Sequence, residues 1–229
     1  MKIFAIDTTT KYISIGIADG PKVYEYRVEL GRKASSLLTV HIKRVLDTLG
    51  WKVIDIDYFG CWLGPGSFTG TRIGVAAVKG LAWILQKPVI GICSLDSITE
   101  NVKFALHTQE ANVICVLDAK RDLVYSAGYR YRAGVFKKIS RYLLVRPQEL
   151  VKKIKPGSII IGDGLTLHKE LFMRQVKGVY FLDKDFWYPT GRALVRLCQE
   201  RIASGKTTDA FKVRPIYLYP KECQIKKQR

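Results

Sequence analysis

The sequence is poor in the residues that build metal and disulfide sites. Its three histidines, His41, His107 and His168, are too far apart to form a metal-binding pair at helical spacing. The five cysteines show no C-x-x-C spacing, and an odd number of thiols in mostly apolar surroundings is typical of a reduced core. We therefore expect neither a metal site nor a disulfide framework.

Long hydrophobic runs are also missing. No apolar run is long enough to span a bilayer, and the first residues reach a carboxylate at Asp7, too soon for a signal peptide. With 229 residues, 48% of them hydrophobic, the chain has enough length for one sizeable core or two modest lobes. These features predict a globular cytoplasmic protein.

Acidic residues are scarce in the second half. Residues 1–110 carry thirteen Lys and Arg against ten Asp and Glu, whereas residues 111–229 carry twenty-five against ten. Nine basic residues lie between Arg130 and Lys155, interleaved with aromatic residues and opposed by Glu149 alone. Such a cluster suits a nucleic-acid backbone, and the alternative is a lysine-rich solvated surface. We take Lys137, Lys138, Lys152 and Lys153 as the candidate contacts to a nucleic-acid backbone.

A glycine-rich segment, 64–70, follows an apparent buried strand at 55–63 and precedes a helix that runs to residue 86. Its glycines permit backbone angles at which amide hydrogens turn inward together, as in anion-binding loops. A P-loop would need Lys-Ser or Lys-Thr after the last glycine, and Thr71-Arg72 stands there instead. A weak anion site and a tight turn against packed backbone both remain open.

The helix after this segment has no polar face. From Ile73 to Leu85 its one charged residue is Lys79, so the helix is buried on all sides or its outer face meets a partner. Small residues along it would let a second helix approach closely. With the helix that starts near Ser35, it supplies the candidate partner interface: Leu37, Val40, Gly74, Ala76, Ala77, Gly80, Ala82 and Trp83.

Hydrophobic periodicity divides the chain into two series of elements. The first has strands at 2–6, 12–18, 23–28, 55–63 and 88–93 and helices at 35–49, 71–86 and 95–106. The second has strands at 113–117, 123–131, 135–139, 142–145 and 158–161 and helices at 148–154, 167–176 and 190–203. Residues 215–218 form an arm, and 221–229 should fray. We expect an N-terminal lobe at 1–110 and a C-terminal lobe at 111–229.

Three segments together resemble the bacterial tRNA threonylcarbamoyladenosine biosynthesis family TsaB, also called YeaZ. They are Lys2–Thr9, Gly64–Gly74 and Leu117–Tyr125, and Pro215–Leu218 adds a fourth, weaker match. The resemblance implies an α/β, two-lobed actin-like fold of the sugar kinase, Hsp70 and actin superfamily, with mixed sheets flanked by helices. It also implies a degenerate phosphate loop formed by Asp7, Thr8, Thr9, Gly64, Gly66, Ser67, Thr69 and Gly70.

The resemblance further implies a non-catalytic scaffold. Its partners would be a catalytic paralogue of the TsaD family, which transfers threonylcarbamoyl to the adenosine beside the anticodon of ANN-decoding tRNAs, and a small ATPase of the TsaE family. ATP and metal are expected on those subunits, tRNA within the complex, and a homodimer when the chain is alone. The HxxxH metal motif of the paralogue is missing, and Ala34-Ser35 replaces a His-Ser pair common in the family. The alternative is an ATP-dependent phosphotransferase.

Overall fold

A computed structural model describes residues 1–30, 34–105 and 108–220. These residues form two compact units, Met1–Ser97 with Pro189–Pro215, and Ile98–Tyr188 with the segment that starts at Ile216. No helix in the described part of the chain is both long and apolar enough to cross a membrane. The end of the helix predicted at 95–106, the tail at 221–229, and His107 and Cys223 lie outside the described residues.

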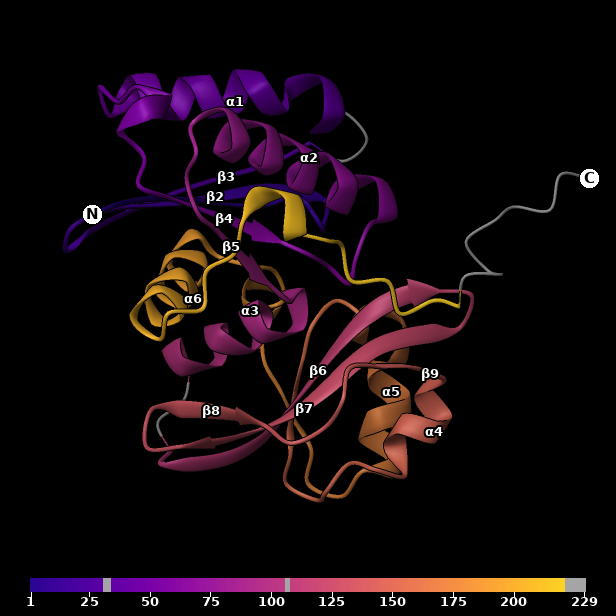
Figure 1. Ribbon diagram of the computed structural model, residues 1–229. Coiled ribbons are helices and arrows are strands. Elements are labelled where there is room, and N and C mark those ends of the chain that lie inside the picture. The colour runs from indigo at the N-terminus through magenta and orange to yellow at the C-terminus, as the bar shows by residue number, and fades with distance from the viewer. Residues whose placement is uncertain (31–33, 106–107, 221–229) are drawn as a thin grey trace, which may run out of the picture. The chain divides into compact units, whose positions relative to one another are not determined.

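The first unit is built on a five-stranded mixed sheet in the order β3-β2-β1-β4-β5 (Figure 1). β1 (Lys2–Asp7), β2 (Tyr12–Asp19) and β3 (Lys22–Glu29) pair antiparallel, and the turn at Gly20 forms the predicted hairpin between β2 and β3. β4 (Tyr58–Trp62) and β5 (Val89–Ile92) continue the sheet in parallel with β1. A 3-10 turn, η2 (Val53–Asp55), precedes β4, so this strand is shorter than predicted.

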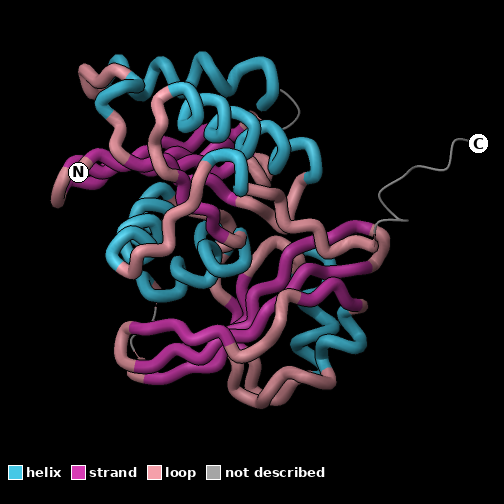
Figure 2. The backbone as a smooth tube through the Cα atoms, in the orientation of Figure 1, coloured by secondary structure: helices cyan, strands magenta, loops and turns pink. Residues whose placement is uncertain are grey.

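Helices cover both faces of this sheet, because successive residues of a strand point to opposite sides. Phe4 and Ile6 of β1 belong to the core under α1 (Ala34–Thr48) and α2 (Phe68–Ile84). Ile3 and Ala5 belong to the core under α6 (Gly191–Ala203), which starts at the N-cap Thr190. Figure 2 shows the same layers, helix, sheet and helix.

The position of α6 differs from the predicted division into lobes at residue 110. Its buried Leu194, Val195 and Cys198 pack on the first sheet, and η5 (Ala210–Lys212) also lies in the first unit. The reason is physical: the α6 side of the first sheet is apolar, with Trp62 only 1% exposed, and needs a helix to cover it. The first lobe therefore includes residues 189–215, and the second lobe begins at Ile98 instead of residue 111 and runs to Tyr188.

The second unit holds a six-stranded sheet in the order β11-β10-β6-β7-β8, with β9 paired to β7. Its antiparallel part consists of β6 (Glu110–Lys120), β7 (Leu123–Arg132), β8 (Val135–Lys138) and β9 (Leu143–Val145). Its parallel part consists of β10 (Ile159–Ile161) and β11 (Tyr180–Phe181), and the short β11 was not predicted.

The remaining elements are short, with one longer helix. They are α3 (Ser94–Glu100), η3 (Asn101–Phe104), α4 (Pro147–Val151), α5 (Leu165–Gln175) and η4 (Lys184–Phe186). Four of the five cysteines are described; all four are buried and none forms a disulfide: Cys61, Cys93, Cys115 and Cys198.

Candidate functional site

The glycine-rich segment leads from β4 into α2, which begins at Phe68, earlier than predicted. Ser67 is the N-cap, and its Oγ accepts a hydrogen bond from the amide of Gly70 at 3.1 Å. The hydroxyl of Thr71 donates to the Ser67 carbonyl at 2.8 Å. The first turn of the helix thus satisfies part of its own hydrogen-bonding capacity within the segment.

The turn after β1 packs directly on this segment. The Ser67 amide donates to the Thr9 carbonyl at 2.7 Å, and the Thr8 hydroxyl donates to the Gly70 carbonyl at 2.7 Å. A Cβ built on Gly66 would lie 2.5 Å from the Thr9 oxygen, and one on Gly70 would lie 2.0 Å from the Thr8 oxygen. Both positions therefore require glycine because backbone approaches backbone.

Asp7 lies at the end of β1 and is completely buried. Its Oδ1 accepts a hydrogen bond from the Thr9 amide at 2.9 Å, which closes the turn, whereas Oδ2 has no hydrogen-bond partner in the described part of the chain. Burial raises the pKa of this carboxyl from 3.8 to about 6, against the opposing effect of the Thr9 hydrogen bonds. The carboxyl has the geometry of a group that holds a turn.

The predicted phosphate-loop residues come together with one exception. Thr8 and Thr9 contact Gly66, Ser67 and Gly70, and Asp7 accepts a hydrogen bond from the Thr9 amide. The Gly64 carbonyl accepts a hydrogen bond from the Ser94 amide at 2.9 Å. Thr69 is exposed on the first turn of α2. The contacts found here are those of a tight turn against packed backbone, and phosphate binding stays a prediction.

The candidate partner interface divides between two faces of α2. Ala76 and Trp83 are exposed on the outer face, Gly80 is half-buried, and Ala77 is half-buried and packs against the core. Gly74 and Ala82 are buried, which corrects their assignment to the interface: they share a stripe with Val78 that faces the sheet. A Cβ on Gly74 would lie 2.3 Å from the Thr8 hydroxyl.

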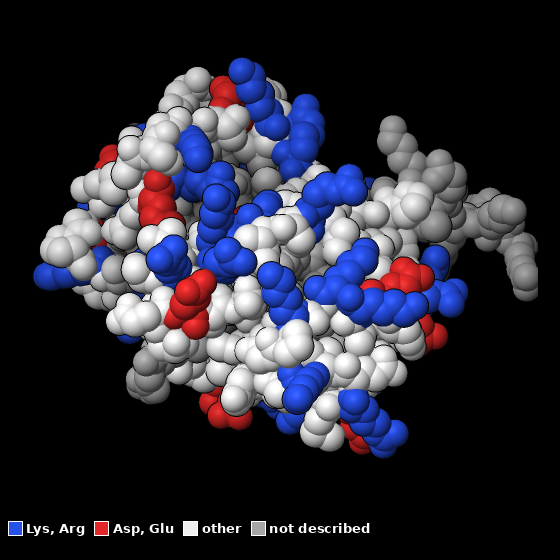
Figure 3. All heavy atoms as spheres, turned by 90° about the horizontal axis from the view of Figure 1, so that it is seen from below, with Lys and Arg blue, Asp and Glu red and all other residues white. Residues whose placement is uncertain are grey.

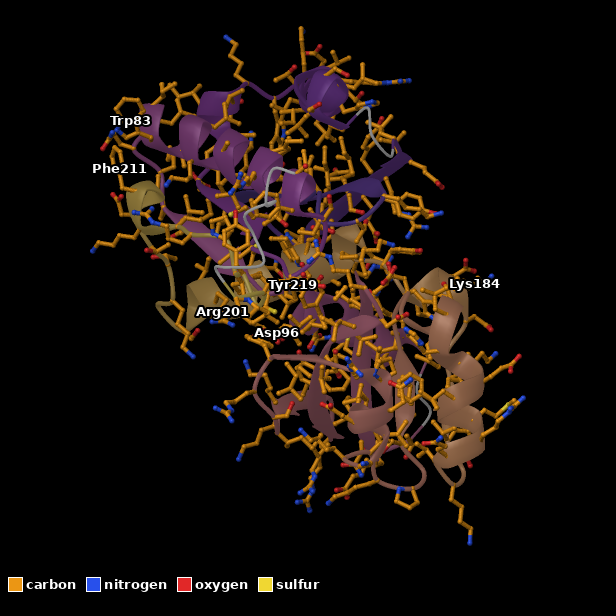
Figure 4. The ribbon with its side chains drawn as sticks, turned by 90° about the vertical axis from the view of Figure 1, so that its right-hand side faces the viewer. Trp83, Asp96, Lys184, Arg201, Phe211 and Tyr219 are labelled. Atoms are coloured by element: carbon orange, nitrogen blue, oxygen red, sulfur yellow. The ribbon has the colours of Figure 1, made fainter. Side chains whose placement is uncertain are left out.

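The other exposed residues extend this outer face. Val40 of α1 is exposed and Leu37 is half-buried. At the end of α2, the ring of Trp83 meets that of Phe211 edge to face, with centroids 5.6 Å apart (Figure 4). Both rings are more than half exposed and border a groove of about 400 Å³. Sequence reasoning missed Phe211 because no local pattern indicates a contact between residues so far apart in the chain.

The four candidate tRNA contacts lie in two places within the second unit. Lys137 and Lys138 end β8, whereas Lys152 and Lys153 follow α4, and all four are exposed. Figure 1 shows β8 and α4 at opposite ends of the second sheet. A single short stretch of phosphate backbone would not reach both.

A second polar cluster was missed at the sequence level. Asp163 Oδ1 accepts a hydrogen bond from the Asp118 amide at 3.0 Å, and Asp118 pairs with the ammonium of Lys120. Burial is the main cause that raises the pKa of Asp163 above its ordinary value. The Tyr219 hydroxyl, labelled in Figure 4, donates to the Ala119 carbonyl at 2.9 Å. The cluster therefore ties the β6–β7 turn to the start of α5 and to the C-terminal arm.

Among the described residues, no three His, Cys, Asp or Glu side chains are grouped so that they could hold a metal ion.

Comparison with known proteins identifies the family. The family model described as TsaD, tRNA N6-adenosine threonylcarbamoyltransferase, matches residues 29–213. The chain is 25% identical to the TsaB protein of Escherichia coli over 95% of its own length and 94% of the relative's, and 27% identical to TsaB of Bacillus subtilis over 75% of each. The chain belongs to the TsaD family and is a TsaB (YeaZ) homologue.

The structural comparison shows the same fold. YeaZ from Pseudomonas aeruginosa superposes with a TM-score of 0.83 at 23% identity, over 95% of this chain and 99% of that one. The match confirms the predicted fold class, α/β with two mixed sheets flanked by helices.

Proposed function

We propose that this chain is a subunit of the machinery that makes threonylcarbamoyladenosine in tRNA, and that it works in the cytoplasm by pairing with a TsaD-family transferase rather than by transferring the group itself. Support for the pathway comes from the TsaB relatives that match nearly the whole chain. Support for a partner of the TsaD family comes from the family model, since paralogues often pair through related surfaces.

The packing around Asp7 is the observation that carries the non-catalytic part of the proposal. A general acid or base has to reach the proton that it moves, directly or through one water. The Asp7 side chain is fully buried, and the backbone of the glycine segment is hydrogen-bonded to the turn beside it. The Asp7 carboxyl and the turn at Thr8 and Thr9 thus hold the fold at the place of a phosphate loop.

The outer face of α1 and α2 is the proposed contact with the transferase. Val40, Ala76 and Ile84 are exposed there, and Trp83 is 53% exposed. Burying apolar side chains of this size against a partner lowers the free energy of the complex. Binding at this face would favour one conformation of the transferase by at most the difference in its affinity for the two conformations.

Reconstitution tests the proposal. The transferase, a TsaE-family ATPase, the threonylcarbamoyl-adenylate intermediate and an ANN-decoding tRNA are mixed with and without this chain, and modified adenosine is measured. We expect transfer to depend on the chain, while formation of the intermediate by a separate enzyme does not. Full transfer in its absence would remove the proposed role.

A further inference from the structure

The β7–β8 hairpin presents several cations on one face. Arg130 pairs directly with Lys137 across the two strands, and Arg132 follows Arg130 by two residues, so the three side chains share a face. All three are exposed. Like charges directly opposite each other destabilise a strand pair, so this arrangement has a cost in the free chain.

Few carboxylates offset that cost. Glu110 of β6 lies opposite Arg132 on the same face, yet within the described ranges no carboxylate forms an ion pair with Arg130, Arg132 or Lys137. Figure 3 shows one face of the molecule, on which Lys and Arg side chains outnumber those of Asp and Glu. A bound anion would therefore reduce the electrostatic repulsion among these cations and lower the free energy of the hairpin.

A shallow cleft of about 640 Å³ lies beside the end of β8, and the described residues that line it include no acid: Lys138, Ile139, Ser140, Arg141, Tyr142 and Leu218. A Cβ built on Gly128 would meet Ile139 and Ser140 at 3.5 and 3.6 Å, and Gly128 shares its face of β7 with Arg130. Ile139 thus lies on the cationic face of the hairpin, whereas Lys138 pairs with Tyr129 and starts from the opposite face, so cations from both faces border the cleft.

The cleft is held in shape by specific contacts. The Ser140 hydroxyl accepts a hydrogen bond from the Gly128 amide at 2.7 Å, which fixes the segment on β7. The ammonium of Lys138 lies 3.5 Å from the centre of the Tyr142 ring, a cation–π contact that positions the charge. A positioned cation loses less conformational entropy when a ligand arrives.

We propose that the β7–β8 hairpin and this cleft bind the phosphate backbone of RNA, which in the assembled complex is the tRNA. The assignment rests on the proposed function. Arginine forks and lysine ammonium groups donate to phosphate oxygens without regard to sequence, and an open cationic cleft suits an extended polyanion better than a small apolar ligand. The lysines after α4 lie at the other end of the sheet and take no part.

Two variants with equal loss of charge test the assignment. The hairpin variant carries Arg130→Gln, Lys137→Gln and Arg141→Gln, and the control carries Lys152→Gln, Lys153→Gln and Lys155→Gln; all six positions are exposed. Thermal melting first establishes that both fold. Binding of an ANN-decoding tRNA to the complex with the TsaD-family partner is then measured over a series of salt concentrations.

The hairpin variant should lower the slope of log K against log salt by roughly 2 to 3, since each lost phosphate contact removes about 0.7–0.9, and the control should keep the wild-type slope. Equal slopes for the two variants, whether both lowered or both unchanged, would overturn the assignment. So would hairpin-dependent binding to vesicles of phosphatidylserine and phosphatidylcholine in equal amounts without binding to tRNA. If the wild-type chain proves dispensable for transfer, the proposed function fails separately from this result.

Discussion

Arginine placed at Ala76 and at Ala82 should separate association from folding. The two positions lie on the same helix, α2, yet Ala76 is exposed whereas Ala82 is 1% exposed within the core under α1 and α2. The same chemical change therefore meets water at one site and packed hydrocarbon at the other.

The magnitudes follow from that difference. At Ala82 an unpaired charge would be buried, which costs several kcal/mol, a large part of the roughly 5–15 kcal/mol that stabilises a domain. At Ala76 the monomer should change by no more than about 0.5 kcal/mol. If α2 faces the transferase, an uncompensated charge in that contact costs roughly 2–5 kcal/mol. Affinity would then fall between about 30-fold and a few thousand-fold.

Thermal melting and sedimentation with the TsaD-family partner measure the two effects. We expect Ala82→Arg to melt far below the wild type, and Ala76→Arg to melt like the wild type but to sediment alone. A folded Ala76→Arg chain that still binds the partner with wild-type affinity would show that the outer face of α2 is not the contact.

Three further predictions concern stability. Gly70→Ala should destabilise the first unit by several kcal/mol, because the new Cβ would lie 2.0 Å from the Thr8 oxygen. Gly80→Ala should be neutral or stabilising by up to about 1 kcal/mol, because no atom lies within 4 Å of its Cβ. Urea melts of both variants measure the two effects. Asp7 binds its proton more tightly in the folded state, where its pKa is about 6. As the pH rises from about 4 to 6, this group should therefore lower the free energy of unfolding by on the order of 2–3 kcal/mol. Asp7→Asn should flatten that part of a plot of urea midpoint against pH. Lys103→Met should cost roughly 3–5 kcal/mol in a denaturant titration, because it removes the ammonium that lies 2.7 Å from the Glu100 carboxylate in a pair whose side chains are only 8% and 6% exposed. An unchanged midpoint would show that this ion pair contributes nothing.

Much of the fold could be predicted because its strands and helices carry clear periodicities. The apolar run of β1, the alternation in β2 and the β-branched runs of β5 and β10 identified these strands to within a few residues. The match of Gly64–Gly74 to a known family identified the fold class.

Other features depend on contacts that local patterns do not encode. The amphipathic pattern of α6 predicts a helix but does not say which sheet it covers. In α2 the apolar residues surround the helix, so the sequence alone could not tell exposed Ala76 from buried Ala82. Asp118 of β6 contacts Asp163, in the turn after β10, because β6 and β10 pair in the second sheet, and local sequence patterns do not reveal which strands pair.

Transfer activity of a complex built with Asp7→Asn tests the central claim most directly. Asparagine keeps an oxygen for the Thr9 amide and removes the charge that catalysis or phosphate chemistry would use. We expect this complex to assemble and to modify tRNA at the wild-type rate, while Ala76→Arg loses assembly and transfer together. An intact Asp7→Asn complex that no longer transfers threonylcarbamoyl would contradict the account and place the chain among the groups that do the chemistry.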